Sequence, residues 1–286
     1  MNFIITIITF IIVLFFYIHI NHHYKTCNDL EIYIIENPSM ERIEEVCNLR
    51  QPFTFKYNNK HLINIFNLEY LINKFGQFDV NIRKIDEDDD ETELYLPLSI
   101  RKTEILIKKD NTFITENNND FISETGLIKY LDQGDELLKP PLISNSYYDF
   151  ICGSKDSFTP LRYSINYRNY IFVTKGEIKL KLACPQDSKY LDQVKDYDNF
   201  EFRSKVDLWN IDDSNKIRVL DITLKEGDIL YIPAYWWYTI KFNELSTVCT
   251  LQYRTYMNNI AILPDLILNF FQRQNIKRKS IRSVKS

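Results

Sequence analysis

Histidine is the side chain that proteins use most often for proton transfer and metal binding near neutral pH. The chain of 286 residues contains only 4 histidines, and three of them, His19, His22 and His23, lie near the N-terminus. The fourth is His61, after which no histidine occurs. Imidazole chemistry is therefore excluded from most of the chain.

Other sequence signatures of catalysis are missing as well. The 6 glycines form neither of the patterns that bind phosphate groups, GxGxxG and GxxxxGK[ST]. There is no GxSxG nucleophile motif, no HExxH zinc motif and no kinase signature. The 5 cysteines are widely spaced without a CxxC pair, which favours free buried thiols over a zinc site. A net charge of −4 argues against nucleic acid as a partner.

The N-terminus has the pattern of a membrane anchor. Residues 3–20 are uncharged and almost entirely apolar, and as a helix they would span about 27 Å, close to the thickness of a bilayer's hydrocarbon core. No basic residue precedes this run and no small-residue cleavage site follows it, which favours an uncleaved anchor over a signal peptide. Lys25 follows the run, so the positive-inside rule predicts a single-pass membrane protein with its main domain in the cytosol.

The elements between the anchor and residue 98 are predicted from short patterns. Residues 31–35 are typical of a strand, and Ser39 is the predicted N-cap of the helix that follows. The inner face of this helix is predicted to consist of Met40, Ile43, Val46 and Cys47. The acidic run at residues 86–93 predicts a solvated loop.

From Leu94 onward the chain consists of short β-branched and aromatic runs separated by turn residues. This pattern predicts an all-β sandwich or barrel, followed by a helix at residues 263–274. The tail that starts at Arg273 is basic, with no acidic residue after Asp265. Such a tail is either simply solvated or in contact with anionic lipid or nucleic acid.

Three stretches carry a resemblance to a known family. They are Thr159-Pro-Leu-Arg-Tyr-Ser with the run from Asn169 to Pro185, then residues 202–210, and then residues 224–240. The last contains Gly-Asp-Ile-Leu-Tyr-Ile-Pro-Ala-Tyr-Trp-Trp, the most specific of the three. In order and spacing they resemble the JmjC/cupin-like double-stranded β-helix, particularly its asparaginyl-hydroxylase-like branch and the cupin-like proteins of large DNA viruses. The resemblance covers residues 140–256.

The resemblance implies a barrel that holds Fe(II) through two histidines and one carboxylate and that binds 2-oxoglutarate. Position by position, the three metal ligands of the family correspond to Arg162, Ser164 and Tyr238, none of which is a ligand of that type. The lysine that binds 2-oxoglutarate corresponds to Ile178, and the nearby Lys179 and Lys181 are predicted to point outward. The resemblance therefore predicts the fold without its metal chemistry.

Two interpretations of Arg162, Ser164 and Tyr238 remain open. In the first, Arg162 is paired with an acid and the three side chains fill the barrel, because a buried unpaired guanidinium is costly. In the second, they form a metal-free pocket in which Arg162 binds a carboxylate or phosphate, supported by the two hydroxyls. An iron site made of carboxylates would have to draw on acids that are predicted at turns or strand ends: Asp156, Asp207, Asp221 and Asp228.

These observations predict a mainly β (α+β) fold. It consists of a double-stranded β-helix barrel with flanking helices, preceded in the chain by one N-terminal transmembrane helix. The predicted segments are 1–25 (anchor), 26–139 (N-terminal part of the module), 140–262 (barrel core) and 263–286 (helix and basic tail). The predicted function is a membrane-anchored binding or scaffolding module without a cofactor, whose partner is a protein or a small anionic ligand. The alternative is an Fe(II)/2-oxoglutarate-dependent protein hydroxylase with an atypical metal site. If the protein is viral, it would lie in a host or virion membrane.

Overall fold

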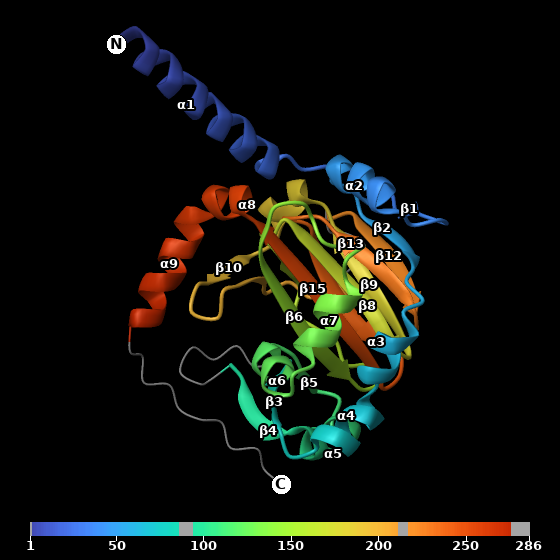
Figure 1. Ribbon diagram of the computed structural model, residues 1–286. Helices are drawn as coiled ribbons and strands as arrows, with labels where there is room; N and C mark the ends of the chain where they lie inside the picture. The colour runs from blue at the N-terminus through green and yellow to red at the C-terminus, as the bar shows by residue number, and fades with distance from the viewer. Residues whose placement is uncertain (1, 86–93, 211–216, 276–286) are drawn as a thin grey trace.

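The structure is a computed structural model that describes residues 2–85, 94–210 and 217–275 (Figure 1). Its helices are α1 (Asn2–Tyr24), α2 (Met40–Leu49), α3 (Lys60–Ile65), α4 (Leu68–Phe75), α5 (Ile100–Lys109), α6 (Asn119–Glu124), α7 (Ile128–Gly134), η1 (Pro185–Tyr190, a 3-10 helix), α8 (Tyr256–Ala261) and α9 (Leu263–Gln274). Its strands are β1 (Tyr33–Ile34), β2 (Phe53–Lys56), β3 (Asp79–Lys84), β4 (Leu96–Ser99), β5 (Phe113–Thr115), β6 (Ile143–Gly153), β7 (Arg162–Tyr163), β8 (Arg168–Lys175), β9 (Glu177–Ala183), β10 (Gln193–Asp196), β11 (Glu201–Ser204), β12 (Val219–Lys225), β13 (Asp228–Ile232), β14 (Trp237–Phe242) and β15 (Ser246–Thr255).

In the described residues the strands form two sheets that face each other. One sheet has nine strands in the order β1-β2-β13-β8-β15-β6-β5-β3-β4, and the other has six in the order β10-β11-β7-β14-β9-β12. The chain passes from β12 to β13, and so between the sheets, through a turn at Gly227, whose φ of 86° suits glycine. The Gly-Asp pair of the most specific matching stretch lies at this turn. The fold is mostly β with helices, and its two sheets are consistent with a cupin jelly roll.

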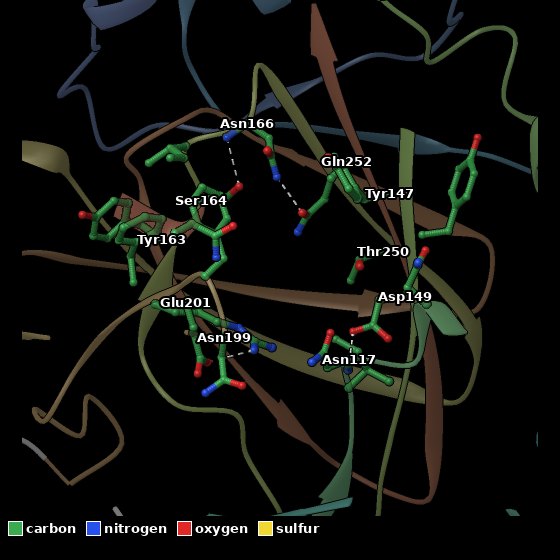
Figure 2. Close-up of a pocket in the computed structure, with 18 of the residues that line it drawn as sticks. Asn117, Tyr147, Asp149, Tyr163, Ser164, Asn166, Asn199, Glu201, Thr250 and Gln252 are labelled. Carbon is green, nitrogen blue, oxygen red and sulfur yellow. Dashed lines mark hydrogen bonds and ion pairs between the residues drawn. The ribbon is translucent and has the colours of Figure 1, made fainter. Parts of the chain in front are cut away.

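The space between the sheets is filled mainly by aliphatic side chains. The nine-stranded sheet contributes residues such as Ile171 and Val248, and the six-stranded sheet contributes residues such as Leu180 and Ile240, all of them buried. Trp236 of the Trp-Trp pair belongs to the same cluster and is fully buried. At one end of the barrel the lining turns polar and the interior opens into a pocket (Figure 2).

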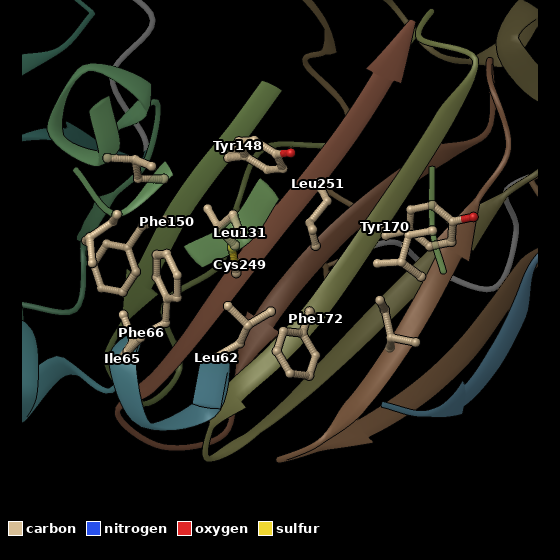
Figure 3. Packing of buried hydrophobic residues seen from close by; sticks show 14 of the residues in the cluster. Leu62, Ile65, Phe66, Leu131, Tyr148, Phe150, Tyr170, Phe172, Cys249 and Leu251 are labelled. Carbon is tan, nitrogen blue, oxygen red and sulfur yellow. The ribbon is translucent and has the colours of Figure 1, made fainter. Parts of the chain in front are cut away.

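The outer face of the nine-stranded sheet is covered by helices. Aromatic residues of the sheet, among them Phe150, Tyr170 and Phe172, pack against Leu62 of α3 and Leu131 of α7 (Figure 3). Since β1 to β5 belong to this same sheet, the segment before residue 139 and the barrel share one hydrophobic core. The domain boundaries given above stay predictions.

Local predictions from the sequence were partly correct. The helix after Ser39 is confirmed as α2, and the Ser39 hydroxyl accepts a hydrogen bond from the backbone N–H of Arg42 at 3.2 Å. Met40, however, is 56% exposed, because a side chain in the first turn points back beyond the helix start. The acidic run at residues 86–93 lies outside the described residues.

The expectation of only β structure from Leu94 onward was wrong between Ile100 and Gly134, where α5, α6 and α7 lie. Helix α5 buries Ile100, Thr103 and Ile107, which is the helical i, i+3, i+7 spacing, against the strands β3 to β5. The β-branched composition of this stretch concealed a helical period. The helix predicted at residues 263–274 is confirmed as α9.

Helix α1 is long and apolar enough to cross a bilayer, and the apolar window within residues 3–24 is 0% buried. Length and composition alone carry this result, and a signal sequence has the same features. The last turn of α1 contacts α8. There His23 is buried, its ring lies 3.2 Å from the side-chain amide of Asn258 in α8, and the Tyr24 hydroxyl donates to the Ala261 carbonyl at 2.6 Å.

Candidate functional site

Strands β7 and β14 bring together the residues at the predicted metal-ligand positions. Arg162 and Tyr238 are direct partners in the antiparallel pairing, and the Arg162 guanidinium lies 5.8 Å from the centre of the Tyr238 ring. Ser164 follows directly after β7. All three residues line one pocket, which has a volume of about 520 Å³ (Figure 2).

A buried network of ion pairs holds Arg162. Its guanidinium lies 2.8 Å from the carboxylate of Glu116 and 3.5 Å from that of Glu201. Arg83 contacts the same two carboxylates at 3.0 and 2.8 Å. Arg83, Glu116 and Glu201 are each at most 9% exposed, so two arginines and two glutamates balance one another at the pocket wall.

The charges in this network stabilise one another against the cost of burial. Burial disfavours an ionised carboxyl, yet Arg162 and Arg83 hold the pKa of Glu116 below its usual value. Burial also disfavours a charged guanidinium, yet Glu116 and then Glu201 raise the pKa of Arg162. Arg162 is therefore a cation that is already neutralised by protein carboxylates, at a position that the resemblance assigns to a metal ligand.

A different wall of the pocket comes from the inner faces of β6 and β15. Asp149 and Thr250 are direct cross-strand partners there, and the Asp149 carboxylate accepts hydrogen bonds from the backbone N–H groups of Asn117 and Asn118 at 2.9 and 2.6 Å (Figure 2). Burial raises the pKa of Asp149 to about 6, although both hydrogen bonds favour the ionised form. The pocket thus contains a carboxyl group that titrates near neutral pH.

Further along β15, Arg254 also lines the pocket, four residues from Thr250, the cross-strand partner of Asp149. It is 7% exposed, and its Nε donates to the Asn166 side-chain oxygen at 2.5 Å. Its guanidinium carbon lies 4.7 Å from the centre of the Tyr147 ring and 5.1 Å from that of Phe200. Burial lowers the pKa of Arg254, and Tyr147 only partly opposes this shift.

The position that the resemblance assigns to the 2-oxoglutarate lysine lies in the apolar part of the barrel. Ile178 is fully buried among apolar neighbours such as Leu180 and Phe242. Lys179 is exposed, as predicted, and Lys181 lies against the Trp209 ring at 5.2 Å on the outer face of the same strand. Neither lysine lines the pocket.

The residues present do not fit an iron ion held by two histidines and a carboxylate. The ligand positions hold a paired guanidinium, a hydroxyl and a phenol, and within residues 2–85, 94–210 and 217–275 no group of three or more His, Cys, Asp or Glu side chains is placed to hold a metal ion. The four aspartates considered above do not line the pocket. Asp221, moreover, lies inside β12 with its side chain 71% exposed, not at a strand end as predicted.

Sequence reasoning missed Glu116, Glu201, Asp149 and Arg254. Glu116 comes from a segment before the barrel, so no local pattern pointed to it. Arg254 does have a local signal. On β15 polar Thr250, Gln252 and Arg254 alternate with buried apolar residues, which places them on the inner face of a central strand.

Comparison with known protein families matches residues 27–260 to the Cupin-like domain. A search of curated proteins found no match. The matched range begins just after the last turn of α1 and ends within α8, so it includes both sheets and every pocket-lining strand. The chain therefore belongs to the Cupin-like domain family.

Proposed function

We propose that this protein is a binding module of the Cupin-like domain family that has lost Fe(II)/2-oxoglutarate oxygenase activity and needs no cofactor. The polar pocket at the barrel mouth is the proposed binding site, for a small anionic ligand or a segment of a protein partner. The order of the three matching stretches supports a relationship to the asparaginyl-hydroxylase-like branch and to viral cupin-like proteins, which we include in the proposal.

The observation that carries the proposal is the pairing of Arg162. A metal ion bound at this position would face a guanidinium, which repels it. Freeing the carboxylates of Glu116 and Glu201 for a metal would leave Arg162 and Arg83 buried without counter-ions, and breaking a buried pair in this way costs about 3–5 kcal/mol. The local charges therefore favour an organic ligand over a cation.

The proposal predicts that the full-length protein, purified in a non-ionic detergent, binds no iron and forms no succinate. We would add Fe(II) and 2-oxoglutarate without oxygen, measure the iron bound per chain, then admit oxygen and follow succinate. Each of the ligand positions lacks the side chain that iron requires, so both signals are expected at the level of a protein-free control. Near-stoichiometric iron together with succinate would contradict the proposal and support the hydroxylase alternative.

We further propose that α1 anchors the protein in a membrane, with the barrel on the cytosolic side. Helix α9 supports this, because it leaves the same corner of the barrel as α1, at α8 (Figure 1). One face of α9 holds polar contacts to the barrel through Asp265 and Asn269, whereas Phe270 and Phe271 are both 60% exposed. An exposed apolar helix face beside an anchor, followed by a basic tail, suits an anionic lipid surface.

Deleting residues 3–20 is expected to move the protein from the membrane fraction to the soluble fraction. The intact protein should stay with membranes during alkaline carbonate washing, because about 27 Å of apolar helix inserts stably. The mass of the purified protein should include the N-terminus. A protein that lacks the first 20 to 25 residues after expression would instead identify α1 as a signal sequence.

A further inference from the structure

Arg254 differs from the other arginines that surround the barrel interior. Arg83 and Arg162 each have carboxylate partners, and Arg168 pairs with Glu44 at 2.9 Å. Among the residues that the structure describes, no carboxylate lies within ion-pairing distance of Arg254. Arg50 is also buried without a carboxylate, but it does not line the pocket.

The spacing along β15 explains why the nearest acid of the same sheet face does not neutralise Arg254. Asp149 is the cross-strand partner of Thr250, and Arg254 lies four residues further along the strand. At about 3.3 Å per residue the two positions are roughly 13 Å apart. The Arg254 guanidinium is therefore held by Asn166, by the Tyr147 hydroxyl, to which its Nη1 donates at 3.3 Å, and by two aromatic rings, but its charge has no carboxylate partner among the described residues. A buried guanidinium without a counter-ion is costly.

A chain of hydrogen bonds orients further donors beside Arg254. Because Arg254 Nε donates to the Asn166 side-chain oxygen, the Asn166 amide nitrogen is left to donate, and it lies 2.6 Å from the Gln252 oxygen. The Gln252 amide nitrogen is thereby left facing the pocket, as Figure 2 shows. The Ser164 hydroxyl accepts a hydrogen bond from the Asn166 backbone N–H at 3.2 Å and keeps its own hydrogen to donate.

We infer that Arg254, Gln252 and Ser164 form a binding subsite for the carboxylate or phosphate group of an organic ligand. This inference rests on the proposed binding function and specifies it. An anion at this position would supply the counter-ion that Arg254 lacks, and charge-assisted hydrogen bonds from a guanidinium to carboxylate or phosphate are strong. The pocket volume of about 520 Å³ exceeds that of a bare anion and leaves room for the remainder of the ligand. The pocket lining also includes Arg273 of α9 and the acids Asp120 and Asp198, so the argument for an anion rests on the surroundings of Arg254 and not on the charge of the whole pocket.

The inference is tested with two probes, inorganic phosphate and succinate, titrated separately into the full-length protein in non-ionic detergent without iron. Isothermal titration calorimetry should detect binding of at least one probe, and the stronger one indicates whether the natural ligand carries phosphate or carboxylate. Arg254→Gln should weaken this binding at least tenfold. Arg101→Gln, which removes an equal charge from the exposed surface of α5, should leave it unchanged.

A second variant keeps the inference testable if Arg254→Gln misfolds. Gln252→Glu keeps Arg254 and changes few atoms, but it places a negative charge where the anion would bind, so binding should also fall at least tenfold. Near-ultraviolet circular dichroism should show that both variants keep the native fold. Absence of binding to the natural chain, or unchanged binding in both variants, would overturn the inference. Neither result would affect the proposed loss of oxygenase activity, which depends on the separate iron and succinate measurements.

Discussion

Replacing Glu116 by glutamine is expected to lower the free energy of unfolding by about 3–5 kcal/mol, the cost of breaking a buried ion pair from one side. Glu116 is 1% exposed and lies 3.0 Å from Arg83 and 2.8 Å from Arg162. Glutamine keeps the shape of the side chain but leaves two buried guanidiniums with one remaining carboxylate between them. Tryptophan fluorescence of the full-length protein in detergent should show a thermal midpoint lower by about 10 °C.

A matched control and a double variant separate charge pairing from general damage. Glu104→Gln breaks an exposed pair with Lys108 at 2.7 Å on α5, and it should change stability by less than about 0.5 kcal/mol. Adding Arg162→Met to Glu116→Gln restores charge balance, so the double variant should be more stable than the sum of the two single losses predicts. Strictly additive losses would show that the network does not act through charge.

The barrel could be predicted from the sequence because its strands follow local rules. The Gly227 turn and the Trp-Trp pair mark the strands of one half of the barrel, and a helix begins after Ser39, where a capping hydroxyl was expected. The helices α5, α6 and α7 were not predicted because β-branched residues are frequent in this stretch. In α5, Thr103 occupies a buried position, and this polar residue obscured the apolar period.

Only part of the candidate site could be predicted from the sequence. Arg162, Ser164 and Tyr238 line one pocket because family motifs fix their positions on β7, directly after β7 and on β14. The partners of Arg162 could not be predicted, since Glu116 and Glu201 are separated from it by 46 and 39 residues, and only the folded sheets bring them together. Pairing over such distances depends on strand order, which no local pattern of charge encodes.

Asp149 should make the stability of the protein depend on pH in a direction opposite to that of an ion-paired carboxylate such as Glu116, whose pKa is lowered. Its pKa is raised from 3.8 to about 6, so the folded state binds the proton more tightly than the unfolded state between these two values. Its contribution to stability is therefore full below pH 4 and is lost as pH rises through 6. The loss is up to about 3 kcal/mol, an upper figure because the side chain is only partly buried.

The measurement compares the natural chain with Asp149→Asn across pH 4.5 to 7.5. Asparagine can still accept a hydrogen bond from the backbone at Asn117 or Asn118 but does not titrate. Any loss of stability that the substitution itself causes is therefore the same at every pH. The difference in unfolding free energy between the two proteins should shift in favour of the variant as pH rises through 6. A difference that stays constant would mean that Asp149 is fully ionised throughout. In that case its two backbone hydrogen bonds would outweigh the burial of its charge.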